Sequence, residues 1–280
     1  MSRREYSAYP ELDDLLEDHA DRLRSALGNL IVAVYLQGSL AIGDFDMTSD
    51  VDFIVATGGE LTAEQVQIAQ TVHAQTYRQR SRWAKRLEYS FFPVSLLQSP
   101  SSPFEADGLP RSEGRELWYF DNGSPSIERS DHDNSLVVRW TLRERGVVIF
   151  GPTPSTLVDP VLTEDLRTEI QRTLVGWGDM VVRDPEPYRN RFYQSFLVLN
   201  YCRGILDLAE GSIHSKLAGV KWARQNLPDA WTPLVNFCWD ERQDPDISTN
   251  QPADPDIFSQ SIEFVTYAVN RMRNLTMRRG

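Results

Sequence analysis

The sequence predicts an α+β fold, in which a mixed sheet with flanking helices is followed by an all-α helical-bundle domain. Two observations support this prediction. Short apolar runs alternate with helical patterns over the first 150 residues, whereas no convincing strand follows a stretch rich in proline and glycine at 151–155. The length of 280 residues suits one large domain or two modest ones. We therefore expect domains at 1–155 and 156–280.

Each element of the first domain has a local signal. Leucines at helical spacing after Pro10 predict a helix that ends at Gly28, a favoured C-terminal stop. Thr62 and Gln65 form a capping box for a helix that extends to about Arg80. Apolar runs predict strands at 30–36, 51–56 and 86–94, and further ordered structure at 118–120 and 136–150. Prolines, glycines and serines predict a loop at 98–114 and a linker at 151–155.

The second domain shows only helical patterns. They predict helices at about 163–182, 188–210, 215–226 and 256–275. Ser215 is a suitable N-cap for the third of them, and Gly211 a suitable end for the second. The acidic, proline-containing stretch 241–255 predicts a surface loop.

Composition limits the classes of partner. The net charge of −11 argues against nucleic acid and favours a cationic partner, although an acidic balance also serves solubility alone. Two cysteines outside any CxxC pattern exclude a cysteine zinc site and fit a reducing compartment. The apolar runs are too short to span a membrane, and no apolar stretch follows the arginines near the N-terminus. We expect a cytoplasmic protein that acts as a monomer and binds neither membrane nor nucleic acid.

The segment with the clearest chemistry is Gly38-Ser39, followed after ten residues by Asp50-Val51-Asp52 at the start of an apolar strand. Alternate residues of a strand share a face, so Asp50 and Asp52 would point one way while Val51 points into the core. Two carboxylates on one face repel each other, and a hard divalent cation such as Mg²⁺ relieves that repulsion. The Gly-Ser turn suits a phosphate. The alternative is a surface strand that begins with two solvated aspartates.

Glu88 adds a third carboxylate. It lies within the apolar run 87–94, where a charge is costly unless it faces a site or the solvent. Beside a strand that carries Asp50 and Asp52, it would serve as a third metal ligand or as a general base for an acceptor hydroxyl. The alternative is a glutamate facing solvent at the edge of the sheet. His132, between two aspartates, is a weak signal for a metal site, and no further histidines match it.

Two sets of motifs resemble known families. The segments 36–43 and 49–55, which contain the Gly-Ser and Asp-Val-Asp motifs, resemble the signature of the polymerase-β-like nucleotidyltransferase superfamily. Further segments are similar to aminoglycoside 3''/9-adenylyltransferases; they are Asp131-His132-Asp133, Val148 to Pro152, Val198 to Arg203, Gly211, Ser215 to Ala223 and Leu227-Pro228. The chain is identified from these motifs as a member of that group, and the resemblance covers most of its length.

The resemblance implies an activity. The enzyme would transfer AMP from ATP to a hydroxyl of a small molecule, an aminoglycoside of the streptomycin or spectinomycin type, and release pyrophosphate. Mg²⁺ would be the cofactor and ATP the co-substrate. Asp50, Asp52 and Glu88 would be the catalytic and metal-binding carboxylates, with Glu88 as the base. The expected nucleotide-binding residues are Gly38, Ser39, Ser49 and Lys216, and the expected substrate-binding residues are Trp118 and Asp184.

One departure from the family pattern concerns the acceptor. Members that bind these drugs carry an acidic residue just before the helix that ends near Arg203, but the stretch 191–195 has none. Protonated amines need acidic partners, which Asp184, Glu186 or Asp179 would supply from upstream. Two alternatives stay open: a nucleotidyltransferase for another acceptor, either a small molecule or a protein side chain, and a catalytically silent nucleotide-binding module.

Overall fold

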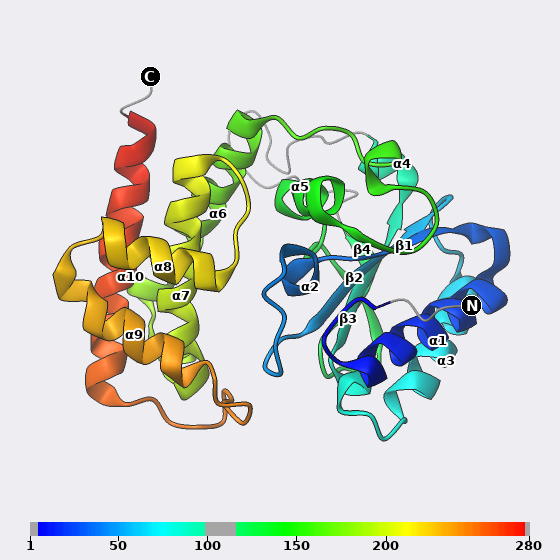
Figure 1. Ribbon diagram of the computed structural model, residues 1–280, viewed down its shortest axis with the longest axis horizontal. Helices are drawn as coiled ribbons and strands as arrows, with labels where there is room; N and C mark the ends of the chain where they lie inside the picture. Colours follow the sequence, from blue (N-terminus) through cyan, green and yellow to red (C-terminus); the bar gives the residue numbers. More distant parts are fainter. Residues whose placement is uncertain (1–4, 99–115, 278–280) are drawn as a thin grey trace. The chain divides into compact units, whose positions relative to one another are not determined.

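The computed structural model describes residues 5–98 and 116–277, and it divides the chain into two compact units (Figure 1). The first unit contains residues 1–45 and 49–161, and the second contains 46–48 and 162–280. Apart from Gln98, the loop predicted at 98–114 lies outside the described residues, as do residues 1–4 at the N-terminus. Within the described residues, no helix is long and apolar enough to cross a membrane.

A six-stranded mixed sheet forms the centre of the first unit, as the sequence predicts. The strand order is β5-β4-β3-β2-β1-β6, and of these neighbours only β2 and β3 run parallel. The strands are β1 (Ile31–Leu36), β2 (Val51–Thr57), β3 (Leu87–Pro93), β4 (Leu117–Phe120), β5 (Ile127–Ser130) and β6 (Val147–Phe150). The hairpin of β4 and β5 was not predicted as such, because its strands are short and β5 is not buried.

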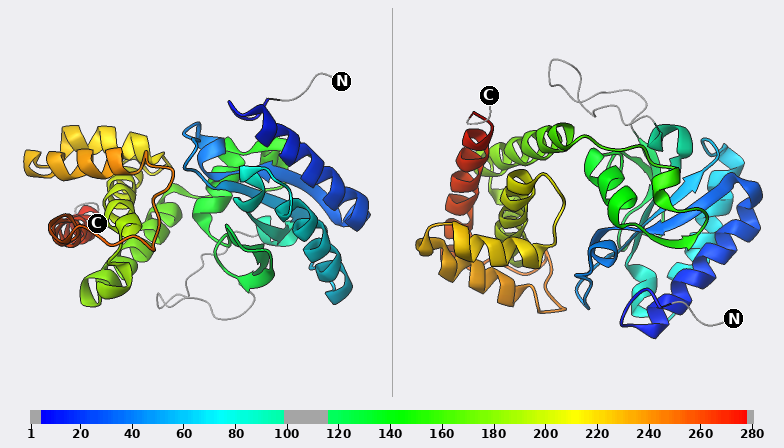
Figure 2. Two further views of the ribbon diagram at one scale, coloured as in Figure 1. Left: turned by 90° about the horizontal axis from the view of Figure 1, so that it is seen from below. Right: turned by 45° about the horizontal axis from the view of Figure 1, so that its top comes forward.

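Helices pack on both faces of this sheet. Helices α1 (Pro10–Leu27) and α3 (Ala63–Tyr77) lie side by side on one face, where His19 and His73 contact strand aromatics (Figure 2). The capping box predicted at Thr62 and Gln65 is present, although α3 ends at Tyr77 rather than near Arg80. The other face packs against α5 (Leu136–Arg145), which joins strand residues in a buried cluster.

Burial along β2 explains why its two aspartates stand out. Val51, Phe53 and Val55 are buried, as predicted. Asp52 shares its face with Ile54 and Ala56, which are buried in the cluster with α5. Both sides of the strand are therefore packed beyond Asp52, and carboxylates are tolerated only where the strand begins.

The prediction of a linker at 151–155 is wrong, because this segment is fixed to the sheet. Pro154 is buried and begins a short 3-10 turn (Pro154–Thr156), while the Tyr35 hydroxyl donates to the Pro152 carbonyl at 2.7 Å. Gly151 has φ +97°, and a Cβ there would lie 2.7 Å from the Val32 carbonyl oxygen. Glycine and proline at this point mark close packing against β1 instead of flexibility.

The second unit is helical. Its helices are α6 (Thr163–Arg183), α7 (Arg191–Glu210), α8 (Lys216–Asn226), α9 (Thr232–Glu241) and α10 (Pro255–Met277). Helix α7 is buried along most of its length and contacts the other four. Ser215 caps α8, as predicted, by accepting from the Ala218 amide at 3.0 Å. The sequence did not predict α9, a helix of ten residues that has a proline in its first turn.

A chain of polar contacts crosses the interface between α1, α3 and β3. The ring nitrogens of His73 lie 3.1 Å from the Ser124 carbonyl and 3.3 Å from the Tyr89 hydroxyl. A carbonyl only accepts, so neutral His73 donates from Nε2 and accepts from Tyr89 at Nδ1. Tyr89 has a single hydroxyl proton, and so His19 must donate to it from Nε2 at 3.1 Å. This arrangement leaves His19 Nδ1 to accept from Thr76 at 2.9 Å.

This chain of contacts makes stability depend on pH. Burial lowers the pKa of His19 to about 3 and that of His73 to about 4. In the folded protein both pKa values lie below 6.5, the ordinary histidine value that applies to the unfolded chain. Unfolding in acid therefore takes up protons, and the free energy of unfolding falls as the pH falls. We expect each histidine to reduce the free energy of unfolding of the first unit by about 2 kcal/mol between pH 7.5 and pH 5.

Two measurements check this prediction. Urea titrations followed by a probe in the first unit should show the loss of stability between pH 7.5 and pH 5. The NMR signals of the His19 and His73 rings should not shift across that range. A ring signal from either residue that titrates near pH 6.5 in the folded protein would contradict the account.

Candidate functional site

The pairing of β2 with β3 brings two of the predicted carboxylates together. In this parallel register Asp52 lies directly opposite Glu88, whose side chain is 13% exposed. Asp50 precedes β2 and accepts a hydrogen bond at Oδ1 from the Asn122 side chain. Like charges directly opposite each other on neighbouring strands are destabilising. The sheet therefore holds an arrangement that favours a cation.

Gly38 allows the Gly-Ser segment to approach Asp52. The Gln37 amide donates to the Asp52 carbonyl at 2.9 Å, and Gly38 then begins the one-turn helix α2 (Gly38–Ile42) with φ +55°. A Cβ at Gly38 would overlap the Asp52 carboxylate, lying 2.7 Å from its Cγ. Only glycine fits here, on grounds of both conformation and space. Ser39 follows within α2.

Ser49 is fixed through its backbone. Ser49 is buried, and its carbonyl oxygen accepts a hydrogen bond from Arg86 Nη1 at 3.2 Å. The Val51 amide donates to the Arg86 carbonyl at 2.8 Å. Arg86 therefore holds the chain on both sides of Asp50, at the point where it enters β2.

Glu88 has two hydrogen-bond partners on one oxygen. The Tyr119 hydroxyl donates to Glu88 Oε1 at 2.9 Å, and His132 Nε2 lies 3.0 Å from the same atom. The hydrogen bond to Glu88 raises the pKa of His132 to about 9, although its side chain is 59% exposed. Burial and the neighbouring carboxylates raise the pKa of Tyr119, so its hydroxyl keeps the proton that it donates. These two donors fix the orientation of the Glu88 carboxylate.

Asp133 contacts residues that lie next to both Gly38 and Glu88. It is 2% exposed, and it accepts from Ser90 Oγ at 2.7 Å and from Gln37 Nε2 at 3.1 Å. Burial raises the pKa of its carboxyl group. Gln37 directly precedes Gly38, and Ser90 lies two residues after Glu88 on the same strand face. Asp133 therefore links the segment that carries Gly38 to the strand that carries Glu88.

His132 has a closer contact with the site than the sequence predicts, and Asp133 was not predicted as a site residue. The pattern Asp131-His132-Asp133 was visible, but Glu88 and Ser90 are more than forty residues away in sequence. Within residues 5–98 and 116–277, no group of three or more His, Cys, Asp or Glu side chains is arranged to hold a metal ion. His132 is instead placed as a partner of Glu88.

The remaining predicted site residues are Trp118, Lys216 and Asp184. Trp118 is half-buried on the opposite face of β4 from Tyr119, with the Arg129 guanidinium 5.0 Å from its ring centre. Lys216 is the first residue of α8 and lies 5.0 Å from the ring centre of Phe196. Asp184 is exposed at the C-terminal end of α6. The last two residues belong to the second unit.

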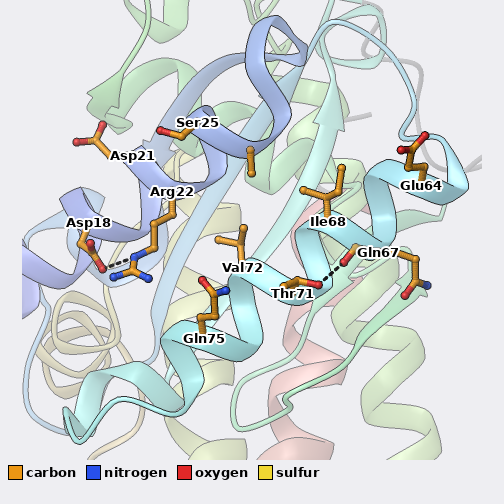
Figure 3. A pocket seen from close by; sticks show the side chains of 11 residues that line it. Asp18, Asp21, Arg22, Ser25, Glu64, Gln67, Ile68, Thr71, Val72 and Gln75 are labelled. Atoms are coloured by element: carbon orange, nitrogen blue, oxygen red, sulfur yellow. Dashed lines mark hydrogen bonds and ion pairs between the residues drawn. The ribbon is translucent and has the colours of Figure 1, made fainter.

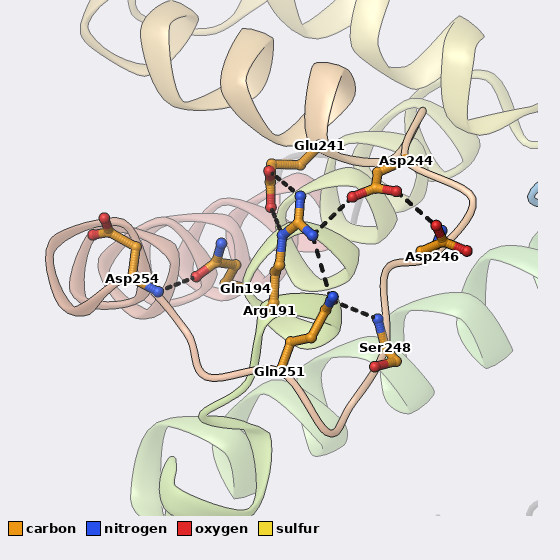
Figure 4. Close-up of polar contacts among 8 residues, drawn as sticks. All are labelled: Arg191, Gln194, Glu241, Asp244, Asp246, Ser248, Gln251 and Asp254. Atoms are coloured by element: carbon orange, nitrogen blue, oxygen red, sulfur yellow. Dashed lines mark hydrogen bonds and ion pairs between the residues drawn. The ribbon is translucent and has the colours of Figure 1, made fainter.

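The start of α7 has acidic neighbours after all. Arg191 donates to both oxygens of Glu241 at 2.8 Å, and it also forms an ion pair with Asp244 at 2.8 Å (Figure 4). These carboxylates come from the end of α9 and the segment after it. The sequence argument considered only upstream residues, because α9 and its fold back onto α7 were not predicted. Both carboxylates are already engaged by Arg191.

A groove on the outer surface of the first unit is a separate feature. It has a volume of about 670 Å³ and is lined by residues of α1 and α3, including Asp18, Arg22, Ile68 and Gln75 (Figure 3). These helices cover the face of the sheet opposite Asp52 and Glu88. Asp18 and Arg22 pair with each other at 2.8 Å. No residue of the carboxylate site contributes to the groove.

Two models of known protein families match this chain. Residues 16–97 match the family model described as nucleotidyltransferase domain. Residues 156–270 match the model described as aminoglycoside adenylyltransferase, C-terminal domain. The chain is an aminoglycoside adenylyltransferase-like nucleotidyltransferase. The family predicted from the motifs is thereby confirmed, as is the fold class.

Individual proteins that are similar to this nucleotidyltransferase are named as adenylyltransferases. Spectinomycin 9-adenylyltransferase of Staphylococcus aureus, from strains Mu50 and N315, is 25% identical over 230 residues, which are 77% of this chain and 79% of the relative. A crystal structure of the spectinomycin adenyltransferase AAD(9) from Enterococcus faecialis, with ATP and spectinomycin, superimposes with a TM-score of 0.63. The superposition covers 93% of this chain and 98% of that chain at 15% identity, and so shows a shared fold.

Two glycine variants test the packing of Gly38 against Asp52. Gly38→Ala should lower nucleotidyl transfer by at least about 100-fold, because the added methyl group displaces the Asp52 carboxylate. Gly43→Ala is the matched control: Gly43 also has positive φ, at +75°, but a Cβ there meets nothing within 4 Å. It should cost stability through the same backbone strain, about 1–2 kcal/mol, and leave turnover within a few-fold. Equal losses of activity in both variants would contradict the account.

Proposed function

We propose that this nucleotidyltransferase transfers AMP from ATP to a hydroxyl of an aminoglycoside of the spectinomycin type, with Mg²⁺ as cofactor and pyrophosphate as the second product. The observation that carries the proposal is the pairing of Asp52 with Glu88 beside Gly38, in a chain that matches both family models. The named activity of the S. aureus relatives supports the choice of acceptor.

The residues present fit a magnesium ion. Mg²⁺ prefers carboxylate oxygens and is commonly held by one or two carboxylates together with substrate phosphates. Asp50 and Asp52 provide those oxygens, and Gly38 carries no side chain that would cover the Asp52 carboxylate. When bound there, Mg²⁺ would neutralise charge on the nucleotide's phosphates. We assign Asp50 and Asp52 to this role.

Glu88 is assigned as the general base rather than as a third metal ligand. Its Oε1 already accepts from Tyr119 and lies beside His132. Within the described part of the chain, no hydrogen bond to Oε2 is found, so that oxygen is available to an acceptor hydroxyl. Oε2 takes the hydroxyl proton as the acceptor oxygen attacks the α-phosphorus. The bond between the α-phosphorus and the bridging oxygen breaks, and pyrophosphate leaves.

Four residues predicted from the sequence are assigned to the nucleotide. Gly38 allows the backbone to approach the phosphates, and Ser39 and Ser49, which both precede the Asp-Val-Asp segment, supply polar groups. Lys216 lies in the first turn of α8, where the helix dipole also favours an anion. Its proposed role is to bind the triphosphate of ATP.

The acceptor is assigned by charge. A net charge of −11 favours a cationic molecule, and the exposed carboxylate of Asp184 is the proposed partner for one of its amines. Trp118 is the proposed aromatic contact. Because Glu241 and Asp244 are paired with Arg191, they offer little to a highly charged acceptor. We also propose that the protein works as a monomer in the cytoplasm, which fits its buried free cysteines, Cys202 and Cys238.

The first experiment measures pyrophosphate release from ATP with a panel that includes spectinomycin and streptomycin. Release should require Mg²⁺ and a drug, and Glu88→Gln should lower it by about 100- to 10,000-fold, because the variant keeps the shape of Glu88 but cannot accept the proton. Glu116→Gln is the control, since Glu116 is exposed and pairs with Arg129. It should leave turnover unchanged.

The outcomes separate the alternatives. Release with no member of the panel, in a protein that still binds ATP, would overturn the aminoglycoside and favour another acceptor. Mg²⁺-dependent release that is unchanged in Glu88→Gln would overturn the assigned base. Failure to bind ATP at all would contradict the whole proposal.

A second prediction concerns Lys216. Lys216→Ala should raise the KM for ATP by about 10-fold or more, because a charge-assisted contact to phosphate is lost, while the KM for the acceptor changes little. Lys221→Ala, which removes an exposed lysine from the same helix, should leave both KM values unchanged. A rise in the KM for ATP that is equal in the two variants would indicate only a general effect of net charge.

A further inference from the structure

The turn between β4 and β5 contacts the carboxylate site, although no motif pointed to it. Asn122 donates a hydrogen bond from its side-chain amide to Asp50 Oδ1, across 72 positions of sequence. In the same turn Asp121 Oδ1 lies 3.0 Å from the Tyr119 hydroxyl and shares its single proton with Glu88 Oε1, which lies 2.9 Å away. The turn therefore contacts Asp50 directly, and it contacts Tyr119, the hydrogen-bond partner of Glu88.

Side chains of helix α3 bind the backbone of this turn. Three successive carbonyls, those of Gly123, Ser124 and Pro125, accept from one stripe of side chains along α3. The donors are Tyr77 at 2.9 Å, His73 at 3.1 Å and Gln70 at 2.6 Å. Their spacing of three and four residues places them on one face of the helix. Gln70 also accepts from the Ile127 amide at 2.8 Å, where β5 begins.

Asp50 needs such support more than Asp52 does. Asp52 lies within the ladder of β2 and β3, which fixes its backbone on both sides. Asp50 lies before the strand, so its carboxylate is oriented by side chains. A neutral amide donor fixes the orientation of the carboxylate without cancelling its negative charge.

We propose that the β4–β5 turn is part of the nucleotide site, with Asn122 as a positioning residue that orients the Asp50 carboxylate for the metal ion. Gln70, His73 and Tyr77 set the position of Asn122 by fixing the turn. The inference rests on the proposed function, because it assumes that Asp50 helps to hold Mg²⁺ and the ATP phosphates.

The test measures Mn²⁺ binding to the full chain in the presence of a non-hydrolysable ATP analogue, by electron paramagnetic resonance of the free ion. Asn122→Ala should weaken Mn²⁺ binding by about 10- to 100-fold, as expected on loss of a partner that orients a metal ligand. The KM for Mg²⁺ in turnover should rise in parallel, while kcat at saturating Mg²⁺ falls by less. Asn122→Gln, which keeps the amide donor, should recover part of the binding.

Two further variants separate positioning from damage to the fold. Tyr77→Phe removes one hydroxyl of the α3 stripe and should weaken Mn²⁺ binding by less than Asn122→Ala does. Ser126→Ala changes the same turn at an exposed side chain whose backbone contacts remain, and should have no effect. All variants should show the same circular dichroism spectrum as the unmodified protein.

Asp50→Asn distinguishes failure of this inference from failure of the proposed function. If Asp50→Asn weakens Mn²⁺ binding but Asn122→Ala does not, the positioning role is overturned and the metal site stands. If Asp50→Asn leaves Mn²⁺ binding unchanged, the metal site of the proposed function itself is overturned.

Discussion

The parallel pairing of β2 with β3 is the constraint on which the rest of the site depends. It places Asp52 opposite Glu88 at the start of two strands whose later residues are buried on both faces. Two like charges at such a position raise the energy of the folded chain unless other groups compensate. The neighbouring residues are best understood as that compensation.

The compensation comes from three directions. His132 and Tyr119 donate to one oxygen of Glu88, the backbone of Gly38 packs closely against the Asp52 carboxylate, and Asn122 donates to Asp50. His132, with its pKa raised to about 9, is a cation at neutral pH and offsets the charge of Glu88. In the proposed function, a divalent cation and its phosphates would add to this compensation at Asp50 and Asp52.

Local signals in the sequence predicted the elements well, because their hydrogen bonds close within a few residues. The capping box of Thr62 and Gln65 and the N-cap Ser215 are examples. Long-range contacts were not accessible in this way. The pairing of Asp133 with Ser90 spans 43 positions, and the close packing of Gly151 against β1 fixes a segment with linker composition to the sheet.

The candidate site likewise combines residues that local sequence patterns reveal with residues that only long-range contacts bring together. The Asp-Val-Asp motif and Glu88 were found from residue type and spacing, and the structure pairs Asp52 with Glu88. The supports of these carboxylates come from β4, the turn after it and the segment before α5, none of which carries a recognisable pattern apart from the His between two Asp. Their roles depend on register, which one sequence does not reveal.

The most direct test of the central claim is a crystal structure with Mn²⁺ and a non-hydrolysable ATP analogue, in which anomalous scattering locates the metal. The account predicts a metal peak within about 2.0–2.3 Å of carboxylate oxygens of Asp50 and Asp52, with phosphate oxygens completing the coordination. A nucleotide bound elsewhere, or a metal bound without either aspartate, would contradict it.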